Sequence, residues 1–210
     1  MNAKSVALTI TFAALAIALN AVEIPSIFYP GVPFQISQIP IVVAFLLFGA
    51  GIGVSVGVVN MIGGLALFPI GPDGIIFYPM NLLSVLIMFA GLHVASRFVM
   101  RDGKLDKSPF WKKPAIGTTA LAVAFRGGIM PIFDYTTYNV LVPLIYGISI
   151  PQAYIVGLVP AFVLYNVTVT IYTVPIAYIV ATRVDKYLKT TPHFLKTEQH
   201  LRETGVYVKS

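Results

Sequence analysis

The basic residues of this chain are gathered into three clusters that long apolar segments separate. Of the 14 Lys and Arg residues, all but Arg126 lie before the first apolar segment, between residues 97 and 113, or after residue 181. Basic residues resist translocation and mark the cytoplasmic side of a membrane, so an even number of crossings must separate successive clusters. The pattern predicts an all-α membrane protein with six transmembrane helices and with both termini in the cytoplasm.

The composition agrees with a chain whose main solvent is lipid. Hydrophobic residues make up 57% of the sequence, charged residues make up 10%, and the mean hydropathy is +0.85. The net charge of +6 comes from the predicted cytoplasmic segments, where the field of the inner leaflet accounts for it without a nucleic-acid partner. We expect a transmembrane domain over residues 1–182, followed by a basic cytoplasmic tail over residues 183–210.

The apolar segments and their breakers predict where the helices and loops lie. The Pro-rich stretch after Glu23, which contains Phe28 and Tyr29, is expected to be an external loop because proline has no amide hydrogen to donate in a helix. The glycines of residues 49–53 predict a tight turn, and a Tyr-rich external segment is expected over 133–152. The first apolar segment is interpreted as a helix and not as a cleaved signal peptide, since Asn-Ala-Val-Glu fits a cleavage site poorly. The expected helices cover 6–22, 37–48, 53–67, 75–96, 115–132 and 153–181.

Motifs for catalysis are missing from the sequence. It has no Gly-x-x-x-x-Gly-Lys-Ser/Thr phosphate loop, no His-Glu-x-x-His zinc helix and no Gly-x-Ser-x-Gly nucleophile turn. The absence of cysteine removes thiolate metal sites and thiol chemistry. We therefore expect a binding or transport protein with no cofactor and no metal, and not an enzyme.

Arg126 is the charged residue that most needs an explanation. It lies near the middle of a predicted span, where a guanidinium costs ~2.5–3.5 kcal/mol or more unless it faces protein or a wet cavity. Its partner is Asp134, eight residues later, or an anionic or carbonyl-rich ligand, and the two do not exclude each other. Gly127, Gly128 and Pro131 predict a break in the helix at this point, which lipid tolerates only against protein or a cavity.

Amide and aromatic side chains gather at the predicted spans and their outer ends. Each amide must find a hydrogen bond, either to a neighbouring helix or to a ligand. Together these residues outline a pocket open to the outside that suits a flat, uncharged or weakly anionic heterocycle. The alternative is an aromatic belt combined with bonds between helices. The residues are Asn20, Gln35, Gln38, Asn60, Tyr78, Asn81, Tyr135, Tyr138, Asn139 and Asn166.

Small residues share one face of the first predicted helix. Ala3, Ala7, Ala14 and Ala18 have helical spacing, and a flat face of small residues lets another helix approach closely. That helix belongs either to the same chain or to a partner subunit.

The order of several motifs resembles the substrate-binding S component of energy-coupling factor (ECF) transporters, and the riboflavin-type branch most of all. The resemblance covers residues 5–182 and includes the alanine face and the long Pro-rich external loop. Its further motifs are Phe34-Gln35-Ile36-Ser37-Gln38-Ile39-Pro40, Phe48-Gly49-Ala50-Gly51-Ile52-Gly53, Met130, and residues 138–147.

The resemblance implies a protein of a prokaryotic plasma membrane that captures a water-soluble vitamin outside the cell. In that family one transmembrane coupling subunit and two ATPase subunits drive release inside, and Ala7, Ala14 and Ala18 would face the coupling subunit. Substrate contacts would come from the first external loop and the outer ends of the later helices. The candidates are Phe28, Tyr29, Gln35, Gln38, Tyr78, Asn81, Arg126, Asp134, Tyr138, Asn139 and Asn166.

Departures from the family pattern leave the ligand open. Riboflavin-type members usually carry Asn-Tyr where this chain has Thr137-Tyr138, and many carry a lysine where it has Tyr165-Asn166. Riboflavin is the leading candidate, and another vitamin or related heterocycle is as plausible. Two other functions are consistent with the sequence: a structural scaffold of the membrane, and a small transporter that works alone.

Overall fold

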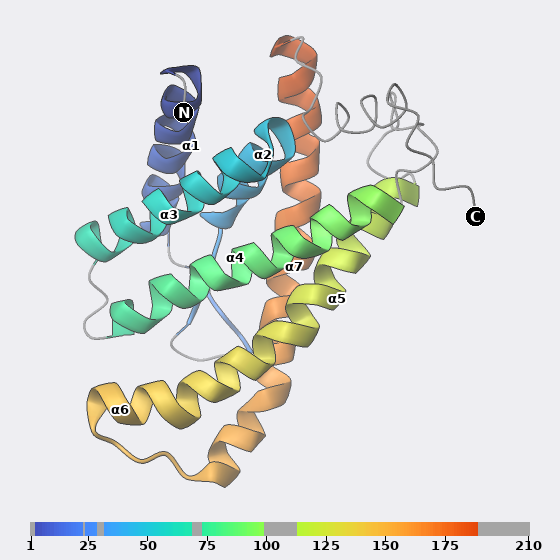
Figure 1. Cartoon of the computed structure of the whole chain (residues 1–210). Coiled ribbons are helices and arrows are strands. Elements are labelled where there is room, and N and C mark those ends of the chain that lie inside the picture. Colours follow the sequence, from blue (N-terminus) through green and yellow to red (C-terminus); the bar gives the residue numbers. More distant parts are fainter. Residues whose placement is uncertain (1–2, 23, 29–31, 69–72, 99–112, 189–210) are drawn as a thin grey trace.

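The fold is a bundle of helices with one short pair of strands (Figure 1), seen in a computed structural model that describes residues 3–22, 24–28, 32–68, 73–98 and 113–188. The elements are α1 (Ala3–Asn20), β1 (Ile24–Pro25), β2 (Pro33–Phe34), α2 (Gln38–Phe48), α3 (Ala50–Leu67), α4 (Asp73–Phe98), α5 (Lys113–Thr136), the π-helix η1 (Thr137–Leu141), α6 (Val142–Tyr146) and α7 (Gln152–Leu188).

Five helical segments of the described chain are long and apolar enough to cross a membrane, which identifies a multi-pass membrane protein. They lie in α1, α3, α4, the continuous stretch from α5 to α6, and α7. The sixth expected span is α2, which has 11 residues. At ~1.5 Å per residue it covers about half of a ~30 Å hydrocarbon layer. The prediction of six helices is confirmed, while only five of them have the length of a full span.

The turn between α2 and α3 is shorter than the glycine-rich sequence suggests. Gly49 alone joins the two helices, with a φ of 89° that favours glycine, and α3 begins at Ala50. The expected turn over 49–53 is therefore wrong. Gly53 already lies inside α3 and against Phe45 of α2, where an added Cβ would come within 2.7 Å of the Phe45 Cβ. Glycine here allows the two helices to pack closely.

The predicted break in the fifth span is also wrong. α5 continues as a regular helix through Gly127, Gly128 and Pro131 to Thr136. Glycine costs a helix only about 1 kcal/mol, and a Cβ on Gly127 would come within 2.7 Å of Val167 in α7, so this glycine makes room for a neighbouring helix.

The irregular backbone of this region lies further along the chain. The π-helix η1 follows α5 directly and leads into α6. The segment expected as an external loop over 133–152 is thus helical as far as Tyr146, and it turns at Gly147, whose φ is 66°. π-helical turns are frequent at functional sites.

The apolar core lies around α2, which packs against α1, α3, α4 and α7. Ile41, Val42 and Val43 are at most 1% exposed. Phe45 stacks on Phe89 of α4 with ring centroids 4.1 Å apart. α4 packs on α5, and α5 packs on α7.

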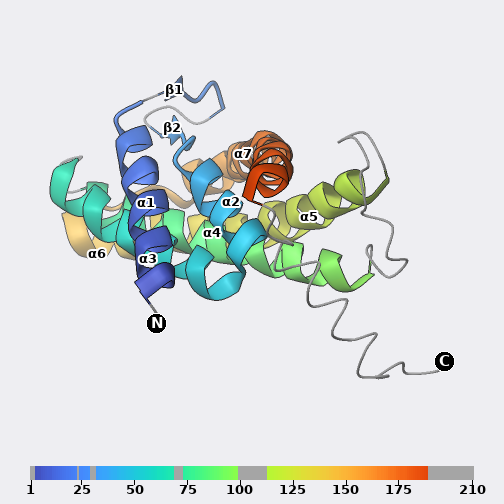
Figure 2. The same cartoon turned by 90° about the horizontal axis from the view of Figure 1, so that it is seen from above.

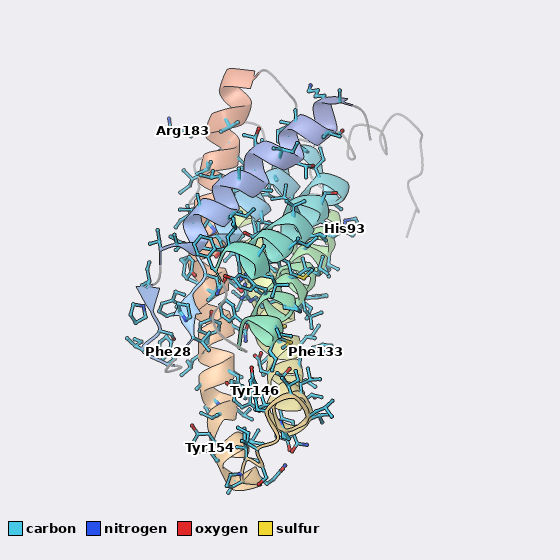
Figure 3. All side chains as sticks on the ribbon, turned by 90° about the vertical axis from the view of Figure 1, so that its left-hand side faces the viewer. Phe28, His93, Phe133, Tyr146, Tyr154 and Arg183 are labelled. Atoms are coloured by element: carbon cyan, nitrogen blue, oxygen red, sulfur yellow. The ribbon has the colours of Figure 1, made fainter. Side chains whose placement is uncertain are left out.

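The two strands lie at one edge of the bundle, near α1, α2 and α7 (Figure 2). They are antiparallel, with Ile24 opposite Phe34 and Pro25 opposite Pro33. The beginning of α1 and the end of α7 lie at the same end of the bundle (Figure 1). Arg183 lies at that end, and Tyr146 and Tyr154 lie at the opposite one (Figure 3).

Candidate functional site

A large cavity opens between α4, α5, η1, α6 and α7, beside the strand β2. Its volume is about 670 Å³, within the range of about 300–1,000 Å³ that is usual for small-molecule sites. The lining combines amide, charged and aromatic side chains with apolar ones. The lining residues are Val32, Pro33, Gln35, Gln38, Ile76, Phe77, Met80, Asn81, Ser84, Arg126, Met130, Asp134, Thr137, Tyr138, Val142, Tyr146, Ile148, Ile150, Phe162, Tyr165 and Asn166.

Helical spacing brings the polar residues of α5 and α7 to the cavity. On α5, Arg126, Met130 and Asp134 follow one another at intervals of four residues and so share a face. On α7, Phe162 and Asn166 have the same spacing. The two helices pack against each other, which places these faces on adjoining walls of the cavity.

Arg126 is buried between two amide side chains. It is 1% exposed, although it lines the cavity. Its Nε donates to Oδ1 of Asn166 at 3.0 Å, and a terminal nitrogen donates to Oε1 of Gln38 at 2.5 Å. The guanidinium thereby connects α5 to both α7 and α2, and its position is fixed from two sides.

The hydrogen bonds continue from Arg126 in both directions. On one side, the amide nitrogen of Gln38 donates to Oδ1 of Asn81 at 2.5 Å, and the amide nitrogen of Asn81 donates to Oε1 of Gln35 at 2.8 Å. On the other side, the amide nitrogen of Asn166 donates to Oδ2 of Asp134 at 2.8 Å. These six residues, Gln35, Asn81, Gln38, Arg126, Asn166 and Asp134, form one chain that we call the polar chain.

Asn166 therefore stands between the arginine and the carboxylate. Its amide nitrogen also donates to the carbonyl of Phe162 at 3.0 Å, so both of its N–H groups are used. Within the part of the chain that the structure describes, Arg126 and Asp134 form no direct ion pair. The two possibilities for Arg126 are thus compatible: it reaches Asp134 through Asn166, and it also lines the cavity.

The polar chain leaves hydrogen-bonding capacity at the cavity. A guanidinium has five N–H donors, and Arg126 uses two of them on Gln38 and Asn166. No acceptor among the described residues takes the other three. The second oxygen of Asp134, Oδ1, likewise has no donor among those residues. A buried charged group with unused hydrogen-bonding capacity is costly, and a ligand in the cavity would reduce that cost.

Aromatic and thioether groups form the rest of the walls. The ring of Tyr138 in η1 lies 5.5 Å from that of Phe162, with 32° between the ring planes. The hydroxyl of Thr137 donates to the sulfur of Met80 at 3.4 Å, which connects η1 to α4. Walls of this kind offer flat, polarisable surfaces to a ring system.

The loop that contains β2 is held beside the cavity by α7. The hydroxyl of Tyr165 donates to the carbonyl of Pro33 at 2.8 Å, and its ring is stacked on Phe34 at 5.7 Å and 3°. Phe34 also meets Tyr172 edge-to-face at 6.2 Å. Pro33 and Tyr165 both line the cavity, so this contact joins the loop to its wall.

The structure brings most of the predicted substrate residues to the cavity, but not all of them. Phe28 meets Phe34 edge-to-face at 6.5 Å and does not line the cavity. Tyr78 is 2% exposed and donates to the carbonyl of Phe68, and Asn139 points to the surface. Tyr29 lies outside the described residues. The predicted residues that do line the cavity are Gln35, Gln38, Asn81, Arg126, Asp134, Tyr138 and Asn166.

Three other predicted residues, two amides and one tyrosine, form hydrogen bonds between helices. Asn20 donates to Asn60 at 3.0 Å, which links α1 to α3. Tyr135 accepts a hydrogen bond from Gln152 and lies outside the cavity lining.

Sequence reasoning missed several lining residues, among them Met80, Ser84, Met130, Tyr146 and Phe162. Helical spacing could have found some of them. Met130 lies midway between Arg126 and Asp134, and Phe162 lies one turn before Asn166. Met130 and Phe162 were not predicted, because an apolar residue looks the same in the sequence whether it faces a ligand, another helix or lipid.

The alanine face of α1 is largely uncovered in the part of the chain that the structure describes. Ala3, Ala7, Ala14 and Ala18 are exposed, whereas Ala13 and Ala16 are 1% and 0% exposed. The hydroxyl of Thr11, between Ala7 and Ala14, is turned back to the carbonyl of Ala7 at 2.9 Å. The side of α1 that carries these alanines is left open.

Comparison with known proteins gives the fold. No family model matches the chain, and no curated protein matches it in sequence. A solved structure described as the S component of a bacterial ECF transporter matches with a TM-score of 0.61 and 21% sequence identity. The match covers 90% of this chain and 99% of that one. The chain therefore has the fold of an ECF transporter S component, as its sequence motifs predict.

Proposed function

We propose that this protein is the substrate-binding S subunit of an ECF-type importer and captures a water-soluble vitamin, with riboflavin as the leading candidate. The observation that supports the proposal most strongly is the cavity of about 670 Å³ with the buried polar chain along its wall. In a membrane protein, buried polar groups are expensive and mark functional sites. Here they surround a space of the size of a small organic molecule.

The positions of the basic residues support a direction of capture. The cavity is built from the end of the bundle that holds α6 and the start of α7, and the opposite end holds Arg183 and the beginning of α1, the helix that carries Lys4. Basic residues stay in the cytoplasm. The proposed orientation has both termini and the tail over 183–210 inside, and the cavity opens to the outside of a prokaryotic plasma membrane.

Release into the cell requires partners in this proposal. The exposed alanines Ala7, Ala14 and Ala18 provide the flat face on which a transmembrane coupling subunit would pack. Two ATPase subunits would supply the energy, since the chain has no phosphate-binding loop of its own. The protein is then a transport subunit and not an enzyme.

Ligand-induced stabilisation tests the proposal directly. We expect one member of a vitamin panel to raise the unfolding temperature of the purified protein, because a ligand at 100 times its Kd stabilises the native state by ~2.7 kcal/mol. Isothermal titration should then give a stoichiometry of one. Arg126→Ala and Asn166→Ala should weaken the binding, whereas Thr136→Ala, an exposed position on α5, should not. No stabilisation by any vitamin would contradict the proposal.

Copurification tests the partners. ATPase and coupling subunits should be recovered with the full-length protein from its own membranes, and uptake into liposomes should require them. Uptake by this chain alone would favour a transporter that works by itself, and recovery of only cell-envelope proteins would favour a scaffold.

A further inference from the structure

We infer that Arg126 and Asp134 together recognise a cyclic amide edge, in which a ring carbonyl lies next to a ring N–H. The inference rests on the proposed function, because it names the chemistry that the same cavity selects. It narrows the ligand to neutral heterocycles that carry a lactam, imide or cyclic urea group.

The protein already holds such a group between these two residues. The carboxamide of Asn166 accepts from Arg126 through its oxygen and donates to Asp134 through its nitrogen, at 3.0 and 2.8 Å. A carbonyl next to an N–H is therefore the pattern that the arginine and the carboxylate jointly satisfy. Asn166 is an internal example of the group that the pair binds.

The same pattern is left open toward the cavity. Three N–H groups of Arg126 and Oδ1 of Asp134 have no partner among the described residues, and both side chains line the cavity. A ligand edge beside Asn166 would place its carbonyl at the arginine and its N–H at the carboxylate. Such bonds to charged groups are the stronger kind in proteins.

The charges at the cavity also favour a neutral ligand. Among the cavity-lining residues, Arg126 supplies one positive charge and Asp134 one negative charge. A neutral ligand preserves that balance in a site where charge is poorly solvated. A carboxylate or an ammonium group would add an unbalanced charge to the cavity.

The neighbouring walls of the cavity suit a flat ring. Tyr138 and Phe162 form an aromatic pair at the cavity, and Met80 and Met130 line it as well. Flat rings pack well on aromatic and thioether groups. The amide edge would thus belong to a ring system that lies between these side chains.

Matched probes test the inference on the full-length protein in detergent. Riboflavin and the methyl ester of biotin are uncharged and contain a ring carbonyl next to a ring N–H, and thiamine, pyridoxine and nicotinate do not contain this group. We expect riboflavin or biotin methyl ester to bind more tightly than the other three probes. We also expect methylation of the ring nitrogen, as in 3-methylriboflavin or the N-methylated ureido ring of biotin, to weaken binding about tenfold or more, since it removes one hydrogen bond to a charged group.

Substitution of the carboxylate identifies its role. In Asp134→Ala the penalty of N-methylation should disappear, while Thr136→Ala on the same helix should keep it. Asp134→Asn, which preserves the shape of the side chain, should reduce the penalty and serves if the alanine variant does not fold.

The outcomes separate this inference from the proposed function. Tightest binding by thiamine, pyridoxine or nicotinate would overturn the inference and leave a vitamin-binding protein. Equal binding of the methylated and unmethylated probes would do the same, and so would an unchanged methylation penalty in the folded Asp134 variants. If none of the five probes binds and no other vitamin does, the proposed function fails, and the inference fails with it.

Discussion

The two ends of α2 belong to two different kinds of interior. From Ile41 to Leu47 the helix is part of a closed apolar core with α1, α3, α4 and α7. At its first residue, Gln38, it enters the polar chain that borders a cavity of about 670 Å³. Gln38 is 0% exposed and Val42 is 0% exposed, so burial alone does not distinguish the two regions.

What distinguishes them is how each region is stabilised. In lipid the hydrophobic effect does not drive helices together, so the core depends on close packing, as at Gly91 of α4, where an added Cβ would come within 2.9 Å of the Cα of Ala122. The polar chain instead depends on hydrogen bonds between amides and one arginine. Its members cost stability, and proteins accept such costs at functional sites. The core therefore provides the rigid frame, and the proposed function assigns recognition of the ligand to the polar chain.

The largest effect on binding is expected from Arg126→Met. The variant keeps most of the side-chain volume and removes the donors to the ligand, each worth ~1.5–3 kcal/mol, so affinity should fall about 100-fold or more. The unfolding temperature without ligand should change little. Removal of the buried charge should stabilise the fold, because such a charge costs ~2.5–3.5 kcal/mol in a span. Loss of the hydrogen bonds to Gln38 and Asn166 should destabilise it, so the two effects oppose each other. Titration of riboflavin and thermal unfolding would measure both quantities.

Arg126→Lys is the matched variant, because it keeps the charge and loses the fork of donors. Its affinity should lie between those of the wild type and Arg126→Met. Wild-type affinity in the methionine variant would mean that the arginine only supports the fold.

The opposite result is expected for Gly91→Val in the core. The added side chain must enter the space occupied by Ala122 and the carbonyl of Leu121, and overpacking of this kind costs ~1–3 kcal/mol. Thermal unfolding should show the loss of stability, while the fraction that remains folded should bind ligand normally. Gly128→Val is the control with the same change in helix propensity, since a Cβ there has nothing within 4 Å. Equal destabilisation by both variants would mean that propensity, and not packing, is responsible.

A third substitution tests whether the exposed alanine face of α1 binds a partner subunit. Ala14→Leu should leave stability and ligand affinity unchanged, because this alanine is exposed, and should weaken association with the proposed coupling subunit by about tenfold or more through overpacking. Ala120→Leu, at an exposed alanine of α5, is the control. Recovery of the partner subunits on the tagged protein would measure the association. A loss of stability in Ala14→Leu would instead show that the side of α1 that carries Ala14 packs within its own chain.

Much of the frame could be predicted from the sequence because it follows from local patterns. Apolar length predicted the helices, and the expected helix over 37–48 agrees with α2 to within one residue. The sequence also predicted that this helix crosses the membrane completely, since its residues are as apolar as a span requires. That prediction was wrong, because 11 residues are too few to cross the hydrocarbon layer. The break expected at Gly127 did not follow either, since the space that glycine leaves is filled by Val167 of another helix.

The site could be predicted in composition but not in connectivity. Arg126, Asp134 and Asn166 each stood out as polar groups in apolar segments. That Asn166 bonds to both of the others depends on how α5 and α7 pack, which no local pattern encodes. Tyr138 lines the cavity and its neighbour Asn139 is exposed, because successive side chains of a helix point in different directions.

The smallest expected effect tests whether the frame holds the loop over the site. Tyr165→Phe removes the hydrogen bond to the carbonyl of Pro33 at 2.8 Å and keeps the ring that is stacked on Phe34. A neutral hydrogen bond contributes ~0.5–1.5 kcal/mol, so ligand should dissociate roughly three to ten times faster while association changes less. Stopped-flow measurement of riboflavin fluorescence would give both rates. Tyr154→Phe, at a tyrosine that is 60% exposed and outside the cavity, should leave both rates unchanged. If Tyr165→Phe also left dissociation unchanged, the stacked rings alone would hold the loop, and the hydroxyl would belong to the structural frame and not to the site.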